Sequence, residues 1–256
     1  MNPFPVPIAL LGLGLAVLVN TLADVLPYTR RLTRPACRHC ETPFRTADYL
    51  LMRPCRNCGQ RRSNRSFIVL ALGMPAALYI WFTQPKLGLF LGLVVLTYLA
   101  VVFVIDIEHR AILHETSYFG AALGLVAGTY LHSTAQGESL LQGLTISVVG
   151  GIVGFGIMYL LYLLGDLLVR WLSRRRGEPI DEVALGFGDV NLTGVLGLIL
   201  GPYWILYCLF LAILAAGLAS IVVVLYALAT KKYEAFMAIP YAPFLIFGAV
   251  VLLFRP

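Results

Sequence analysis

The stretch VNLTGVLGLILGPYWILYCLFLAILAAGLASIVVVLYALA, residues 190–229, decides the class of fold because it contains no charged residue. About 20 consecutive apolar residues suffice to cross a lipid bilayer as a helix. The stretch is too long for one such helix. Its Gly201-Pro202 pair is a natural break, because proline removes a hydrogen-bond donor and clashes with the preceding turn. The stretch therefore predicts two membrane-spanning helices that meet at Gly201.

The rest of the chain has the same apolar character. Of its 256 residues, 59% are hydrophobic and 12% are charged, whereas soluble domains average about 25% charged residues. This composition excludes a soluble globular domain, a disordered chain, a coiled coil and a small disulfide scaffold. We predict an all-α polytopic membrane protein of about eight transmembrane helices, with seven as the alternative. The other apolar runs are at 5–26, 67–83, 87–107, 117–132, 144–168 and 239–254.

The basic residues predict how these spans are oriented. Seventeen of the 19 Lys and Arg residues fall in alternate connections: residues 27–66, Arg110, the loop near 169–188 and Lys231-Lys232. Basic residues concentrate in cytosolic loops, so we expect these connections in the cytosol and both termini outside. The formal charge of +6 therefore reflects the basic cytosolic loops of a membrane protein and does not indicate nucleic-acid binding. No basic residue precedes the first apolar run, which favours a retained span over a cleaved signal peptide.

Four of the five cysteines lie in the arginine-rich segment 27–66. Cys37, Cys40, Cys55 and Cys58 form the pattern C-x2-C-x14-C-x2-C. Each pair can place two thiolates on one tight turn, and two such turns can enclose a tetrahedral zinc ion. Two disulfides are the alternative, but the reducing cytosol keeps thiols free. The pattern predicts a structural zinc site in a small cytosolic module, because four thiolates leave no open position for catalysis.

Four aspartates fall in or beside the apolar runs, where charged side chains are costly and are functional candidates. Asp24 and Asp166 lie near cytosolic ends and are expected to snorkel or to pair with basic side chains. Asp106 ends the third span and Asp189 opens the sixth, both at the cytosolic edge. Antiparallel neighbouring helices could therefore bring these two carboxylates together.

Two adjacent carboxylates can work as an acid–base pair, because like charges about 3 Å apart resist joint ionisation and share one proton. One carboxylate can take a proton from water while the other polarises a peptide carbonyl. Gly186 and Gly188 have no side chains, so the extended backbone of a substrate could approach Asp189 closely. The alternative for Asp189 is that it only caps the start of a helix.

Together these features resemble the prepilin peptidases, or type IV leader peptidases, which are GxGD intramembrane aspartyl proteases. The resemblance covers nearly the whole chain. The matching segments are Asn20 and Pro27 at the end of the first span, the two cysteine pairs, Ser63-Asn64-Arg65, Ile105-Asp106, Gly186-Phe187-Gly188-Asp189, the glycines at 194, 197 and 201, and Ile239-Pro240-Tyr241-Ala242-Pro243-Phe244.

The resemblance implies a membrane endopeptidase with Asp106 and Asp189 as its catalytic dyad. Its substrate would be a type IV prepilin or pseudopilin precursor, cleaved at the cytosolic face of the inner (plasma) membrane to remove a short basic leader. Many members also methylate the new N-terminus with S-adenosylmethionine. This chain has Asn191 where the family has a lysine, and it differs elsewhere, so methylation is left open.

Two other functions fit parts of the pattern. The aspartates could form the relay of a proton- or ion-coupled transporter, although they lie at one membrane face rather than at the midplane. Alternatively, the chain could be a non-catalytic assembly factor of a secretion or pilus machine. The lipid bilayer and a precursor protein are the expected partners, and the sequence leaves the oligomeric state open. The expected organisation is a first span over 1–26, the zinc module over 27–66 and a peptidase domain over 67–256.

Overall fold

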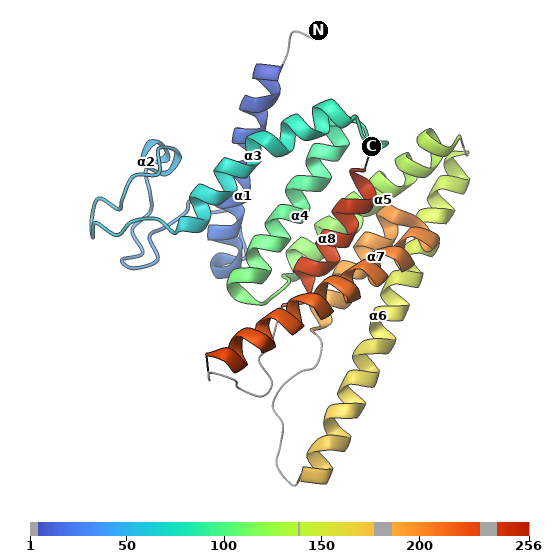
Figure 1. Ribbon diagram of the computed structural model, residues 1–256. Coiled ribbons are helices and arrows are strands. Elements are labelled where there is room, and N and C mark those ends of the chain that lie inside the picture. Colours follow the sequence, from blue (N-terminus) through green and yellow to red (C-terminus); the bar gives the residue numbers. More distant parts are fainter. Residues whose placement is uncertain (1–4, 138, 177–185, 231–239, 256) are drawn as a thin grey trace. The chain divides into compact units, whose positions relative to one another are not determined.

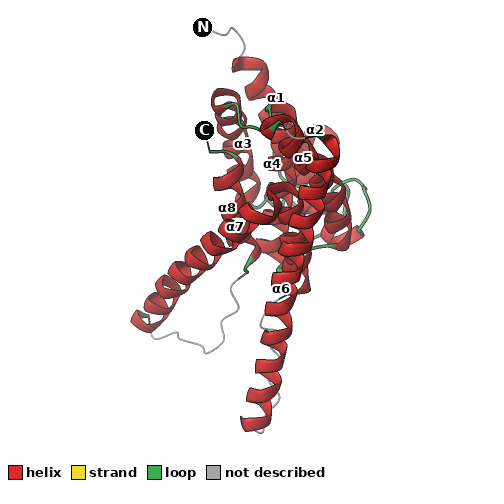
Figure 2. Cartoon of the chain, turned by 90° about the vertical axis from the view of Figure 1, so that its right-hand side faces the viewer, coloured by secondary structure: helices red, strands yellow, loops and turns green. Residues whose placement is uncertain are grey.

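A computed structural model describes residues 5–137, 139–176, 186–230 and 240–255. Within these ranges the chain consists of helices and loops, with one isolated bridge between Ala36 and Pro43 (Figure 2). The all-helical architecture predicted from hydropathy is therefore confirmed. The helices, labelled in Figure 1, are α1 (Pro5–Thr29), α2 (Thr46–Leu50), α3 (Asn64–Thr83), α4 (Leu89–His109), α5 (His114–Gln136), α6 (Leu140–Arg176), α7 (Phe187–Ala229) and α8 (Ala242–Leu253).

Five of the described helices, α1, α3, α4, α6 and α7, are long and apolar enough to cross a membrane, which indicates a membrane protein. The helix α5 covers the predicted span at 117–132, and α8 covers most of the run at 239–254. The 12 residues of α8 extend about 18 Å at 1.5 Å per residue, less than a hydrocarbon core of about 30 Å. Lys231, Lys232 and Ile239, which entered the predicted topology and the resemblance, lie outside the described residues.

The predicted break at Gly201-Pro202 is confirmed. Gly201 has φ 81° and ψ 171°, so the long α7 consists of two helices that join at a kink. Proline disfavours the helical conformation for the residue before it, and the positive φ there favours glycine. The apolar tract thus folds as two helices, as its length requires.

The chain divides into two compact units, residues 1–105 and 106–255, with the boundary inside α4. In the first unit, α1 packs against α3 through small residues. A Cβ added to Gly12 would lie 2.5 Å from the Gly73 carbonyl oxygen and 2.6 Å from the Ala77 Cβ, so this contact requires glycine. Small residues let membrane helices approach closely. The buried Asn20 adds a hydrogen bond from its side-chain amide to the Ser66 carbonyl, at 3.1 Å.

In the second unit, α7 packs against α5, α6 and α8. A Cβ on Gly150 of α6 would overlap the Gly197 carbonyl oxygen of α7. The Ser147 hydroxyl, also on α6, donates to the Leu198 carbonyl at 2.7 Å. A Cβ on Gly248 of α8 would lie 2.7 Å from the carbonyl oxygen of Cys208, a residue that is fully buried. Backbone-to-backbone contacts therefore fix the mutual positions of these helices.

Candidate functional site

Asp106 lies in the last turn of α4. Its carbonyl accepts a hydrogen bond from the Arg110 backbone N–H at 2.8 Å, and Arg110 then turns the chain out of the helix with φ 50°. The side chain is 5% exposed, and its Oδ2 atom has no hydrogen-bond partner among the described residues. A buried carboxylate oxygen without a partner is costly and is typical of functional sites.

Asp189 lies in the first turn of α7. The N-cap residue Gly186 is extended, and its carbonyl accepts the Asp189 backbone N–H at 3.1 Å. The Thr193 hydroxyl donates to the Asp189 carbonyl at 2.7 Å. Asp189 is 9% exposed. The Asp189 carboxylate also interacts with the Gly186 backbone, which is compatible with the capping role considered from the sequence.

The second unit brings Asp106 and Asp189 together. Their carboxylates lie close enough for their charges to interact. The same contact region includes the loop after α4, because a Cβ on Gly188 would lie 2.7 Å from the Ile112 Cβ. A Cβ on Gly186 would lie 3.4 Å from the Asp189 Oδ2 atom and would meet little else. Gly188 thus accommodates Ile112 of the same chain, whereas Gly186 keeps space beside the carboxylate.

An apolar groove of about 670 Å³ runs between α5, α6 and α7 in the same unit. Phe187 and Asn191 of α7 line it. These two residues are four apart and share one face of the helix, whereas Asp189, two residues from each, lies on the opposite face. The carboxylate site and the groove therefore occupy different sides of α7.

The four cysteines of the N-terminal segment converge in the first unit. Their Sγ atoms all lie within 4.8 Å of one another, with 3.5 Å between Cys37 and Cys58 and 3.5 Å between Cys40 and Cys55. Tetrahedral zinc–thiolate bonds of about 2.3 Å place neighbouring sulfur atoms about 3.8 Å apart. All four thiols are free of disulfide bonds. The set of ligands and its spacing fit a metal ion such as zinc.

Without a metal ion, the four thiols do not ionise alike. Hydrogen bonding with the Thr42 side chain lowers the pKa of Cys40 to about 6. A backbone hydrogen bond from Gln60 lowers the pKa of Cys58, but desolvation and the neighbouring thiols raise it further, to about 12. Four thiolates cannot ionise together without a compensating charge, and a bound cation would deprotonate them all.

The structure also shows contacts that the sequence did not reveal. Asp24, expected to snorkel or pair, forms ion pairs with Arg38, Arg62 and Arg65. Asp166 pairs with Arg170 at 2.8 Å, as expected for residues four apart on a helix. The excess of arginines in residues 27–66 was the only signal for the Asp24 pairs. No signal identified the packing of Ile112 on Gly188, because both are ordinary loop and helix-start residues.

Comparison with known proteins identifies one family. The type IV leader peptidase family model matches residues 93–221, about half of the chain, and this range includes both aspartates. No significant match is found among curated proteins or among solved structures.

Proposed function

Because the chain belongs to the type IV leader peptidase family, we propose that it is an aspartic endopeptidase that removes the short basic leader of a type IV prepilin or pseudopilin precursor. The observation that carries this proposal is the pair of buried carboxylates, Asp106 and Asp189, which come from the ends of two different helices within one compact unit. An aspartic protease needs such a pair, and the Asp106 Oδ2 atom has no hydrogen-bond partner among the described residues.

In the proposed mechanism the two carboxylates share one proton, because two like charges about 3 Å apart resist joint ionisation. The ionised carboxylate takes a proton from a water molecule, which attacks the peptide carbonyl carbon. The protonated carboxyl group donates a hydrogen bond to the carbonyl oxygen and stabilises the charge that develops there. The tetrahedral intermediate then collapses: the peptide C–N bond breaks, the carboxyl group that took the proton from water gives it to the leaving amine, and the other carboxyl group regains the shared proton.

We assign different tasks to the two glycines. The open space at Gly186 lets the extended backbone of the substrate approach Asp189 without a clash. Gly188 receives Ile112 and so holds the loop after α4 against the start of α7. This contact keeps the helix ends that carry the two carboxylates at a fixed separation.

The charge distribution supports a cytosolic position for the site. The topology predicted from the sequence assigns the arginines of residues 27–66, Arg110 and the two carboxylates to the same membrane face, and basic residues favour the cytosolic side. The protein would then have about eight spans in the inner (plasma) membrane. A substrate whose apolar helix lies in the bilayer would present the junction between leader and helix at the cytosolic membrane face, where we place the two carboxylates. We further propose that the Cys37, Cys40, Cys55 and Cys58 cluster holds a structural zinc ion.

The test is cleavage of a co-expressed prepilin by Asp106→Asn and Asp189→Asn variants. Each change removes an acid–base group that accounts for a factor of about 10² to 10⁴ in rate, so no mature product should accumulate. Asp166→Asn is the matched control, because Asp166 is 43% exposed and pairs only with Arg170 among the described contacts. Mass spectrometry of the product N-terminus, with and without S-adenosylmethionine, also reveals whether methylation occurs.

Normal processing by either Asn variant, at equal protein level, would contradict the dyad. A thermal melting curve in detergent establishes that each variant is folded. Loss of cleavage in Asp166→Asn as well would mean that charge loss in general, rather than the dyad, abolishes activity.

A further inference from the structure

The short helix α2 of the cysteine module has a buried side and an exposed apolar end. The side chains of Asp48 and Tyr49 are buried, whereas Leu50 and Leu51, which follow directly, are 49% and 62% exposed. Asp48 and Leu50 are two residues apart, so they lie on opposite sides of the helix. Packing within the described residues therefore leaves two adjacent leucines largely uncovered.

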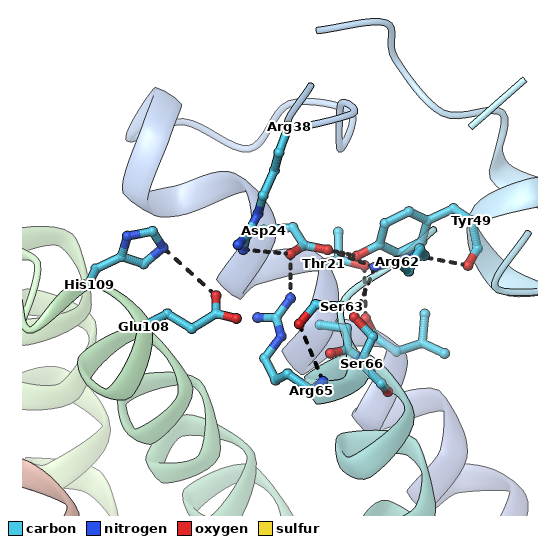
Figure 3. A network of polar contacts seen from close by, with 12 residues as sticks. Thr21, Asp24, Arg38, Tyr49, Arg62, Ser63, Arg65, Ser66, Glu108 and His109 are labelled. Carbon is cyan, nitrogen blue, oxygen red and sulfur yellow. Dashed lines mark hydrogen bonds and ion pairs between the residues drawn. The ribbon is translucent and has the colours of Figure 1, made fainter. Parts of the chain in front are cut away.

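Polar contacts fix the buried side of α2 to the rest of the first unit. The Asp48 carboxylate accepts two hydrogen bonds from Arg56, at 2.7 Å and 2.9 Å, which join α2 to the turn of the second cysteine pair. The Tyr49 hydroxyl donates to the Asp24 carboxylate of α1 at 2.8 Å (Figure 3). The guanidinium carbon of Arg62 lies 3.8 Å from the centre of the Tyr49 ring. These contacts give α2 one orientation relative to α1.

The contact between Tyr49 and Asp24 also sets the depth of α2 along α1. Asp24 lies two residues before the end of the apolar run 5–26, which is about 3 Å along the helix axis. The lipid headgroups begin at this level if α1 crosses the bilayer. Leu50 and Leu51 follow Tyr49 at about 3.8 Å between successive Cα atoms, so they lie beside the span. Figure 1 shows α2 alongside α1 rather than beyond its C-terminal end.

Exposed arginines flank the leucine pair. Arg45 is the N-cap residue of α2 and Arg53 follows the helix, and both are exposed. The whole segment 27–66 contains ten arginines but only two acidic residues, Glu41 and Asp48. Arginine side chains can extend from an apolar surface to the headgroups, and basic residues near a membrane attract anionic lipids. Apolar side chains beside basic ones are typical of segments that lie in the membrane interface.

We propose that α2 lies in the membrane interface, with Leu50 and Leu51 inserted among the lipid chains and Arg45 and Arg53 at anionic headgroups. The cysteine module is then held against the bilayer by this contact as well as by its connections to α1 and α3. The bilayer is the occupant that the geometry favours, because the contact with Asp24 places the leucines beside a helix that is apolar enough to cross a membrane. The contact does not depend on the proposed peptidase activity, so its test needs no substrate.

The test uses the full-length protein in liposomes of phosphatidylglycerol and phosphatidylcholine. The photoreactive residue benzoylphenylalanine, which inserts into nearby C–H bonds on illumination, replaces Leu50 in one sample and Asn57 in the control. Asn57 is exposed and adjoins Arg56, which pairs with Asp48 on the buried side of α2. Mass spectrometry should find phospholipid attached at position 50 and none at position 57.

A second probe position tests whether the leucines themselves hold α2 at the membrane. Thr46 is exposed, and it shares one face of α2 with Leu50, four residues later. With benzoylphenylalanine at position 46, the double variant L50Q/L51Q should reduce the yield of attached phospholipid by about tenfold or more, because two leucine side chains are lost from the apolar contact. The matched control L32Q changes a leucine outside α2 that is 82% exposed, and it should leave this yield unchanged.

Three results would overturn the proposal. Equal yields of attached phospholipid at positions 50 and 57, or none at position 50, would exclude a specific contact with the bilayer. Attachment of position 50 to a protein chain in place of lipid would assign the leucine pair to a protein contact. An unchanged yield at position 46 in L50Q/L51Q would show that the leucines do not hold α2 at the membrane. Thermal melting and zinc content of each variant show that the module is folded.

Discussion

In the first unit, charges at the polar ends of α1 and α3 add to the glycine contact at Gly12, whereas in the second unit glycine contacts join α5, α6, α7 and α8. Asp24 lies at the centre of three arginine contacts, and the cysteine cluster lies beside it in the chain. At Gly150 the helices of the second unit instead meet backbone to backbone. Charged contacts depend on bound ions and solvent, while backbone contacts depend on shape alone.

This difference suits the two units to different tasks. A pair of catalytic carboxylates must keep a fixed separation, and helices in direct backbone contact provide a rigid support for it. The family match lies mainly in this second unit. In the first unit, four thiols that could hold a metal ion converge, and charged side chains gather around Asp24. Three substitutions or treatments test this contrast, in order of decreasing effect.

Metal removal should have the largest effect, and only in the first unit. The cysteine module has one short helix, α2, and metal binding contributes about 10 kcal/mol or more to the folding of small four-ligand sites. A chelator, or Cys37→Ser, should abolish the protection of residues 36–60 against hydrogen exchange and reduce the zinc content from one ion per chain. Cys208→Ser is the control and should keep the metal. A module that stays protected without metal would contradict the zinc site.

Gly150→Leu should destabilise the second unit by about 3 kcal/mol or more, because its side chain would overlap the backbone of α7. The measurement is the thermal melting temperature in detergent. Gly156→Leu is the matched control on the same helix, since a Cβ there meets nothing within 4 Å. Equal melting temperatures of the two variants would contradict backbone contact as the determinant of this packing.

Asp24→Asn should have the smallest effect, a loss of about 1 to 3 kcal/mol confined to the first unit, because it leaves three guanidinium groups without their carboxylate. Limited proteolysis of the 30–63 segment reports this loss. Asp166→Asn removes a single exposed pair and should change stability by less than about 1 kcal/mol. If Asp24→Asn proved as neutral as Asp166→Asn, the charge network would not hold the unit together.

Much of the fold could be predicted from residue order alone. Hydropathy located the helices, and the Gly201-Pro202 pair located the kink in the longest of them. The cysteine spacing predicted a cluster that could hold a metal ion, and the thiols do converge. The roles of Asp106 and Asp189 stay predictions, although the structure places the two side chains in one unit.

The contacts of individual side chains could not be predicted. The sequence suggested that Asp24 would snorkel or pair, but not that it would contact three arginines at once. The small residues at Gly12 and Gly73 were not recognised as a helix contact. Both depend on how two helices are rotated about their axes, and residue order within one helix does not specify that rotation.

The sequence by itself determined which segments are helical and apolar, where the long tract breaks and which thiols group together. These properties follow from hydropathy and from the spacing of residues along the chain, and both depend only on residues that are near one another in the sequence. Only the tertiary structure decided that Ile112 packs on Gly188, that Asp106 lies near Asp189 and that Asp24 contacts three arginines. Such contacts join distant residues, and their energies arise only when separate helices have packed against one another.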